Sequence, residues 1–334
     1  MTLQDDMQQD SPEMFIRDIR SGELHFRKRV PVAILGSTSF IGQKLVCLLA
    51  KHHWFNLITL TGPDELVGRS YGSIVHWHQH EPIPEKIANL TLVSNTPEHV
   101  DTHLVFSALE GTEGKASEEQ FAKSGSVVLS CVNDYSEDGL IPLIVPEANL
   151  EQIELIKKQT YSERGHLVGF AGVPATGLAI AVRPLALEFG IEAIHSVCLQ
   201  SAPYEERRFS KELERITTNA ISFCPTCLQT SIGERCIQAV SIKLKNPATA
   251  EALQLAWKEF CPPICESHMP TAPTNAISYV DDVHNVAQDG MTIFVSHLKQ
   301  CPLFDFKFVI SYSSLMKNAL LTAEYLIKQG TIFW

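Results

Sequence analysis

A short apolar run that ends at a glycine is the feature that most constrains the fold. Residues 30–35 are all apolar, and the run stops at Gly36. From Ile41 to Ala50, apolar residues recur at helical spacing. A strand, a tight turn and a helix in this order are typical of the first unit of a doubly wound α/β domain. Such domains bind the phosphates of a dinucleotide at this turn.

The turn has the sequence Gly-Ser-Thr-Ser-Phe-Ile-Gly. Gly36 and Gly42 occupy the first and last glycine positions of a dinucleotide turn, whereas Ser39 occupies the middle one. A side chain at position 39 is expected to narrow the approach of a pyrophosphate to the backbone N–H groups. An ordinary βα turn is the alternative interpretation. The candidate cofactor-binding residues of the turn are Gly36, Ser37, Thr38, Ser39, Phe40, Ile41 and Gly42.

Two acidic residues follow the second predicted strand, which spans residues 57–60. Asp64 and Glu65 stand roughly 20 residues beyond the glycines, where doubly wound folds often place an acid that binds the ribose. A carboxylate there accepts a hydrogen bond from a ribose 2′-hydroxyl and repels a 2′-phosphate. The pattern favours NAD over NADP, with a solvated Pro-Asp-Glu turn as the alternative.

The order of predicted elements defines the domains. Strands and helices alternate up to about residue 147, and the pattern then changes. The further elements expected are strands at 104–107, 127–130, 193–200, 239–244 and 306–311, and helices near 118–123 and at 176–189, 248–260 and 313–328. The early alternation predicts a Rossmann-like parallel sheet, and the later pattern predicts a second, α+β domain. The expected units are an extension at 1–29, a dinucleotide-binding domain at 30–173, a second domain at 174–305, and a strand and helix at 306–334 that return to the first domain.

Composition excludes several classes of protein. The formal charge of −11 argues against a nucleic-acid or anionic-membrane partner, because phosphate binding needs a basic face. Mean hydropathy is +0.01, and no run approaches the roughly 18 apolar residues of a membrane span. The first thirty residues lack the pattern of a signal peptide, and nine scattered cysteines do not form a disulfide framework. We expect a cytoplasmic protein whose partner is a small molecule or another protein.

Two clusters have the residue types of a metal site. His76, His78 and His80 alternate, so that in a strand they would project from one face. Cys224 and Cys227 have zinc-like spacing, with Cys261, Cys265 and His268 as conceivable further ligands. A redox-active Cys-x-x-Cys is a further alternative. Ordinary strand or loop histidines and unligated cysteines are the favoured interpretation, so no metal is expected.

Five sequence blocks have a likeness to one known family. The blocks are residues 36–42, 53–55, 105–109, 142–147 and 304–309. They resemble aspartate-semialdehyde dehydrogenase, most closely the branch found in archaea and fungi, and the similarity extends over most of residues 31–330. The resemblance implies a nicotinamide cofactor, NAD or NADP, and a dimer built by sheet packing in the second domain. It also implies that Ser107, Ala108 and Leu109 contact the cofactor.

The resemblance implies a chemistry whose residues this sequence lacks. The family reduces aspartyl phosphate through a cysteine thioester, which requires a thiolate, an acid/base histidine and arginines that hold anions. Val173 stands at the position of the nucleophile, Gln229 at that of a substrate arginine and Cys236 at that of the histidine. Ser136 falls near a second arginine, and Tyr312 begins the segment 312–315 at the nicotinamide side. The parent reaction should be absent, and the dinucleotide could have been lost with it.

Two functions remain open for the altered cleft. Gln200 is kept from the family pattern, so the ancestral-site candidates are Cys236, Gln200, Gln229 and Tyr312. Cys236 could act as a nucleophile if the neighbouring Arg235 lowered its pKa, whereas buried cysteines are usually inert. The first function is a repurposed small-molecule enzyme that catalyses reduction, cyclisation or isomerisation. The second is a pseudoenzyme that binds or scaffolds. Either could form a homodimer or a heterodimer with a paralogue.

Overall fold

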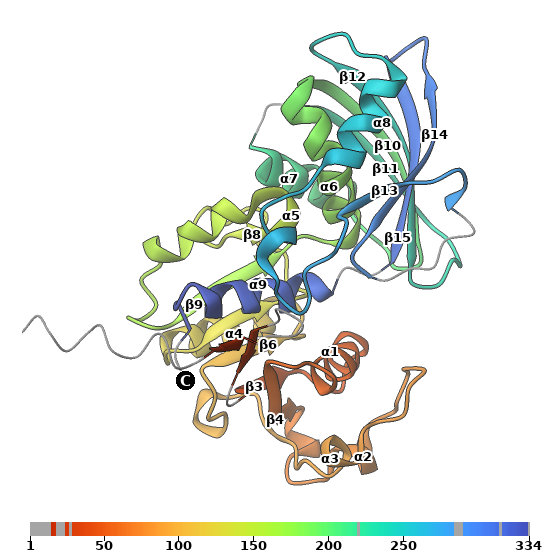
Figure 1. Ribbon diagram of the computed structural model, residues 1–334. Coiled ribbons are helices and arrows are strands. Elements are labelled where there is room, and N and C mark those ends of the chain that lie inside the picture. Colours follow the sequence, from red (N-terminus) through yellow and green to blue (C-terminus); the bar gives the residue numbers. More distant parts are fainter. Residues whose placement is uncertain are drawn as a thin grey trace, which may run out of the picture.

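The protein consists of two α/β units, each built on its own sheet (Figure 1). The computed structural model describes residues 15–17, 24–26, 29–218, 221–283, 290–313 and 316–332. Most of the predicted extension, 1–29, lies outside these ranges. Its described parts are strands β1 (Phe15–Arg17) and β2 (Leu24–Phe26), which pair antiparallel.

The first domain has a seven-stranded parallel sheet in the order β5-β4-β3-β6-β7-β9-β8. Its strands are β3 (Val30–Leu35), β4 (Phe55–Gly62), β5 (Val93–Ser94), β6 (Leu104–Ser107), β7 (Val127–Ser130), β8 (Leu143–Ile144) and β9 (His166–Phe170). Residues of β6 and β7 are buried throughout, and so are those of β3 except Pro31, as expected of central parallel strands covered on both faces. The predicted doubly wound fold is confirmed.

Helices cover both faces of this sheet. They are α1 (Phe40–Ala50), α2 (Tyr71–Ile74), α3 (Glu85–Ala88), α4 (Gly111–Lys123), α5 (Pro146–Asn149) and α9 (Lys317–Lys328). Four 3₁₀ turns accompany the helices of the two domains, at Asp64–Leu66, Pro97–His99, Leu150–Lys158 and Cys265–Ser267. Helix α1 buries Leu45, Val46 and Leu49 against the sheet in a core that also contains Leu320 and Leu326 of α9. The end of the chain thus packs against the first domain.

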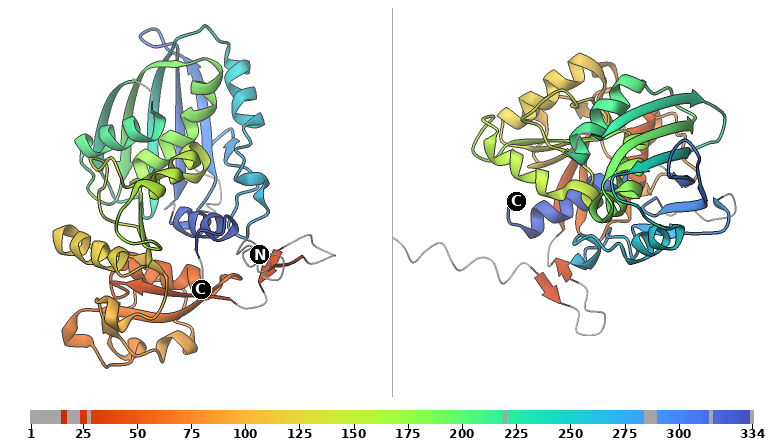
Figure 2. Two further views of the ribbon diagram at one scale, coloured as in Figure 1. Left: turned by 90° about the vertical axis from the view of Figure 1, so that its left-hand side faces the viewer. Right: turned by 90° about the horizontal axis from the view of Figure 1, so that it is seen from above.

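The second domain has a six-stranded mixed sheet in the order β11-β10-β12-β15-β14-β13. Its strands are β10 (Ile191–Gln200), β11 (Ser222–Gln229), β12 (Arg235–Leu244), β13 (Ile277–Tyr279), β14 (Ile293–Gln300) and β15 (Phe306–Ser313). Helices α6 (Val173–Glu188), α7 (Glu206–Thr217) and α8 (Ala250–Glu259) lie on one face of the sheet (Figures 1 and 2). The opposite face carries no helix of this domain among the residues that the structure describes.

The expected boundary near the C-terminus differs from the one observed. Strand β15 pairs with β12 and β14 in the second sheet, and only α9 returns to the first domain. The reason is the alternation along β15, which buries Phe306, Phe308 and Ile310 in the core of the second domain. No helix among the described residues has the length and apolar character needed to cross a membrane.

Candidate functional site

The turn after β3 requires both of its glycines. Gly36 has a φ of 68°, and a Cβ there would lie 3.1 Å from the carbonyl oxygen of Ala108. A Cβ at Gly42 would lie 2.3 Å from the carbonyl oxygen of Gly36, which is closer than real Cβ contacts. The first turn of α1 can therefore approach the loop this closely only with glycine at position 42. This is the geometry that a dinucleotide phosphate needs, so the turn fits the group.

Ser39 takes part in the turn through its own side chain. It is the N-cap of α1, and its Oγ accepts a hydrogen bond from Gly42 N at 3.0 Å. The same hydroxyl donates to the carbonyl oxygen of Gly36 at 3.0 Å. The hydroxyl is thus held against the loop's own backbone.

A hollow of about 570 Å³ adjoins this turn where β4, β5 and β6 end. Asn95 connects the hollow with the turn, because it lines the hollow and its Oδ1 accepts a hydrogen bond from Gly36 N at 3.4 Å. Four carboxylates line the hollow, and among its described lining residues there is no lysine or arginine. These carboxylates belong to Asp64, Glu65, Glu110 and Glu113. The two acids expected near the ribose therefore lie beside the turn, and two further acids join them.

The three cofactor candidates at and just after the end of β6 have different positions. Leu109 lines the hollow, whereas Ser107 and Ala108 are buried. Ser107 Oγ accepts from Leu109 N at 3.3 Å, so it stabilises the bend after the strand. Of these three candidates, only Leu109 is placed to touch a ligand in this hollow.

A second cavity, of about 180 Å³, is lined by residues of both domains. Val173, the first residue of α6, lines it, and Gly172 is the N-cap of that helix. The lining residues are Ile41, Cys131, Val132, Phe170, Ala171, Gly172, Val173, Thr176, Tyr204, Arg208, Met316, Asn318 and Ala319. Its wall is mainly apolar, with a few polar groups. This is the position at which the sequence resemblance locates the reactive cysteine.

The thiol of Cys131, which lines this cavity, is not activated. Burial raises the pKa of Cys131 well above its usual value, and the nearby Glu118 carboxylate raises it further. Only the thiolate is a good nucleophile. The raised pKa therefore disfavours Cys131 as a nucleophile.

Two polar side chains that line the cavity, Tyr204 and Arg208, are bound to a third behind them, Glu212. Glu212 Oε1 accepts from Arg208 Nε at 2.8 Å, and its Oε2 accepts from Gly172 N at 2.8 Å and from the hydroxyl of Tyr204. The Glu212 side chain is fully buried. Burial raises its pKa, although Arg208 and these hydrogen bonds act in the opposite direction. Sequence reasoning missed this group, because no local pattern brings Gly172 and Glu212 together.

The four ancestral-site candidates form two separate pairs, and none of them lines the cavity. Cys236 and Tyr312 face each other in register on β12 and β15 and are buried. Gln200 and Gln229 are in register on β10 and β11, and their side-chain amides donate to the backbone of Ala202 and Ser201. Their assignment to a site stays a prediction, and residues 314 and 315 of the nicotinamide-side segment lie outside the described ranges.

Cys236 lies in a packed core. Its Sγ is 3.5 Å from Cys198 Sγ, and the Tyr312 hydroxyl accepts from Gln238 Nε2 at 2.6 Å. Burial opposes ionisation of Cys236, whereas hydrogen bonds from Cys198, Tyr312 and Gln238 outweigh it and lower the pKa. Because its exposed fraction is 1%, a substrate cannot reach this thiol in the described conformation.

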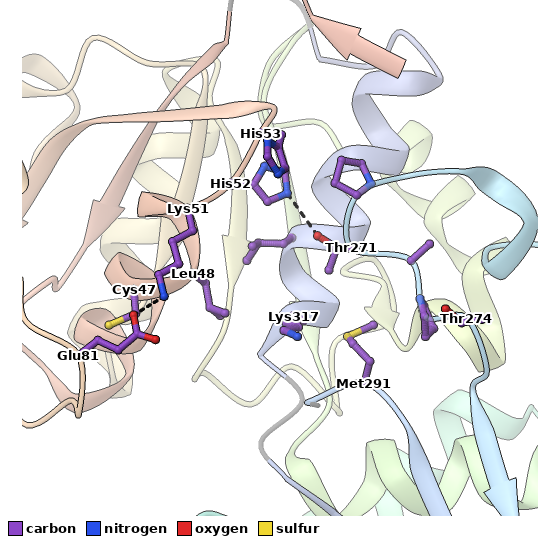
Figure 3. A pocket seen from close by; sticks show the side chains of 14 residues that line it. Cys47, Leu48, Lys51, His52, His53, Glu81, Thr271, Thr274, Met291 and Lys317 are labelled. Atoms are coloured by element: carbon purple, nitrogen blue, oxygen red, sulfur yellow. Dashed lines mark hydrogen bonds and ion pairs between the residues drawn. The ribbon is translucent and has the colours of Figure 1, made fainter. Parts of the chain in front are cut away.

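A third hollow, of about 500 Å³, lies between the end of α1, the loop around Thr271 and α9 (Figure 3). His52 reaches its wall, and its Nε2 is 2.6 Å from Glu324 Oε1. Since His52 Nδ1 accepts from Trp54 N at 3.1 Å, the proton belongs on Nε2. Thr271 N also donates to Glu324, at 3.1 Å. Both ring nitrogens are engaged, so His52 joins the loop to α9 and is not a free base.

The candidate metal ligands do not converge. Among the described residues, no group of three or more His, Cys, Asp or Glu side chains is placed to hold a metal ion. His78 and His80 lie in a loop between α2 and α3, and Cys224 and Cys227 lie on strand β11.

The first domain matches a known family model. Residues 31–156 match the model described as "Semialdehyde dehydrogenase, NAD binding domain". Aspartate-semialdehyde dehydrogenase from Archaeoglobus fulgidus is 25% identical, with 91% of this chain and 100% of the relative covered. The enzyme of the same name from Cryptococcus neoformans is 24% identical, covering 92% and 99%. A malonyl CoA reductase (NADP) from Metallosphaera sedula is 26% identical, also covering 92% and 99%.

Solved structures have the same fold over nearly the whole chain. Aspartate-semialdehyde dehydrogenase with NADP from Candida albicans superposes with a TM-score of 0.83 at 22% identity, covering 91% of this chain and all of the other. The type II enzyme from Vibrio cholerae, complexed with ASA, has a TM-score of 0.69 at 17% identity, covering 90% and 99%.

The fold and the glycine turn define an α/β protein with a dinucleotide-binding domain of the semialdehyde dehydrogenase type. The chain is thus similar to aspartate-semialdehyde dehydrogenases in sequence over about nine-tenths of its length, and it shares their fold. The matched family model describes residues 31–156 as an NAD-binding domain.

Proposed function

We propose that this protein is a repurposed member of the family, which acts on a small molecule other than aspartyl phosphate. The observation that carries the proposal is Val173 at the start of α6, lining the cavity where the resemblance places the nucleophile. An isopropyl side chain cannot form a thioester. The neighbouring Cys131 has a raised pKa, so it does not supply the thiolate instead.

The state of the cavity favours an enzyme over a scaffolding protein. A pseudoenzyme could fill the cleft with large side chains such as Phe170 or Tyr312. Phe170 lines the cavity without closing it, and Tyr312 packs against Gly177, where a Cβ would lie 2.0 Å from its ring. Polar groups of Thr176 and Asn318 remain at the wall. A mainly apolar cavity with few polar groups is typical of small-molecule sites.

NAD(H) is the dinucleotide we assign to the turn between β3 and α1. When bound, its nicotinamide would donate or accept a hydride. Support comes from the carboxylates of Asp64, Glu65, Glu110 and Glu113 beside the turn. A 2′-phosphate in that hollow would meet negative charge without a lysine or arginine among the described lining residues.

Reduction of a small carbonyl compound is the direct test. The protein is mixed with NADH and a panel of small aldehydes and ketones, and NADH oxidation is followed by absorbance. We expect turnover with at least one of them, and loss of this turnover in Ala171→Phe, which fills the cavity. Leu228→Phe, at an exposed position of β11, is the matched control and should keep full activity. Tight NADH binding without turnover of any compound would instead favour the pseudoenzyme.

A further inference from the structure

At the start of helix α6, the backbone N–H of Gly172 binds a carboxylate of the protein itself, the side chain of Glu212. Glu212 of α7 accepts from Gly172 N, from Arg208 Nε and from the Tyr204 hydroxyl. The guanidinium of Arg208 also lies over the Tyr204 ring, 5.4 Å from its centroid. One buried carboxylate thus occupies the donors that face this side of the cavity.

These donors would otherwise form an anion site. Helix α6 has 16 residues, so its N-terminus carries a positive partial charge, and the N–H of Gly172 lies at that end. Arg208 adds a full positive charge and lines the same cavity. Asp134 is the other acidic neighbour of Arg208 and is more distant than Glu212, with 3.9 Å between Arg208 Nε and Asp134 Oδ1. Glu212 is therefore the group that neutralises this site.

A ligand anion could enter only at a high cost. It would face a buried carboxylate of like charge, or it would have to displace Glu212 from its three donors. A displaced carboxylate in this packed region would lose its partners while still shielded from water, which costs several kcal/mol for a buried ion. Either route disfavours an anionic ligand.

We propose that Glu212 is a built-in anion that restricts the cavity between the domains to uncharged ligands. This inference rests on the proposed function, because it takes the cavity to be the substrate site. Asn318, another residue that lines the cavity, supports it. Its Oδ1 is buried without a hydrogen-bond partner among the described residues, so it can accept from a hydroxyl or amide N–H of a neutral ligand.

Inorganic phosphate is the probe that tests this restriction. In Glu212→Gln the side chain keeps its shape and loses its charge, which leaves Arg208 without its nearest carboxylate. We expect this variant to bind phosphate at least about tenfold more tightly than the wild type by calorimetry, as a charge-assisted hydrogen bond can supply this difference. Glu214→Gln removes an exposed charge from the same helix and should leave phosphate affinity unchanged.

Two further variants locate the effect. The double variant Glu212→Gln with Arg208→Gln should lose the gained affinity, whereas Glu212→Asp, which disturbs packing but keeps the charge, should not gain it. The inference is overturned if Glu212→Gln binds phosphate no better than Glu214→Gln. If Glu212→Gln does not fold, the wild type decides the question. If the wild type binds phosphate saturably and Arg208→Gln abolishes this binding, the inference is overturned. If the wild type shows no saturable phosphate binding, the inference is supported. Phosphate binding is measured without turnover. A result against the inference would therefore overturn the restriction to uncharged ligands without deciding whether the protein catalyses the proposed reaction with NADH.

Discussion

Single residues decide what the dinucleotide turn can bind. Gly36 and Gly42 allow the backbone of α1 to approach β3, and the Ser39 hydroxyl holds this arrangement from within. The phosphate end of the site thus depends on backbone geometry. If NAD(H) binds as we propose, its ribose would meet negative charge, because Asp64 and Glu65 lie at the hollow beside the turn.

Asp64 is the residue whose change should alter cofactor preference. We expect wild-type protein to bind NADH more tightly than NADPH in calorimetric titrations. Asp64→Ser should weaken NADH binding by about tenfold, the value of one hydrogen bond to a charged group, and should narrow the preference. Glu98→Gln, an exposed acid outside the hollow, is the control. Tighter binding of NADPH to the wild type would show that the acids do not contact the ribose.

At the scale of elements, helix α5 contains a carboxylate in an unfavourable place. Glu147 is buried, and neither of its side-chain oxygens has a hydrogen-bond partner among the described residues. Burial raises its pKa from 4.5 to about 7, with a smaller opposing effect from its own backbone N–H. The folded state therefore holds this proton more strongly than the unfolded chain.

The stability of the protein should consequently depend on pH through Glu147. Between pH 4.5 and about 7 the folded state binds more protons than the unfolded state, so the free energy of unfolding falls as pH rises. The loss should amount to roughly 3 kcal/mol at most and should level off above about pH 7. Urea unfolding across this range measures it. Glu147→Gln should remove this part of the pH dependence, whereas Glu151→Gln should keep it. An unchanged profile in Glu147→Gln would contradict the assignment.

Elements with a simple apolar pattern are predictable from sequence. The strands expected at 104–107 and 127–130 coincide with β6 and β7, because both are buried on both faces. Strand β11 is hidden in the sequence by Pro225, which a strand tolerates only at an edge, and β11 is the edge of its sheet. Helix α7 is hidden by its charges, although Phe209 and Leu213 are buried.

The candidate site is predictable only in part. The glycine turn and Asp64 are local features, so their places follow from strand order. The contact of Glu212 with Gly172 joins residues 40 positions apart through the packing of α7 on α6, and no local pattern indicates it. Conversely, Cys236 and Tyr312 align with ancestral site positions, yet their side chains lie in the core of the second domain.

For the whole molecule, the open face of the second sheet suggests how two copies associate. Val197, Ala239 and Val309 lie in register across β10, β12 and β15, and none of the three is fully buried. The helices of this domain lie on the opposite face. The next row of this face, His195, Ser241 and Lys307, is polar, so its apolar part is the row of Val197, Ala239 and Val309. Exposed apolar surface of this kind would be an aggregation hazard without a cover. We propose that a second copy of the chain covers it, or else a paralogue.

Light scattering at micromolar concentration tests this association. We expect a mass near twice 37.1 kDa for the wild type, and a monomer for Ala239→Glu, which places charges within the apolar face. Lys243→Glu, at an exposed position of β12 outside the row formed by Val197, Ala239 and Val309, should remain a dimer. A wild-type monomer would mean that the chain covers this face itself.

The cytoplasmic location expected from the cysteines stays a prediction.

The absence of the parent reaction is the central claim, and one assay tests it most directly. Phosphate-dependent reduction of NADP with aspartate semialdehyde is measured for the wild type beside an ordinary member of the family. We expect a rate far below a tenth of that member's. We also expect no recovery in Val173→Cys, because the resemblance assigns Gln229 and Cys236 to the positions of the family's arginine and histidine. A wild-type rate within about tenfold of the ordinary enzyme, a barrier difference of only about 1.4 kcal/mol, would contradict the account.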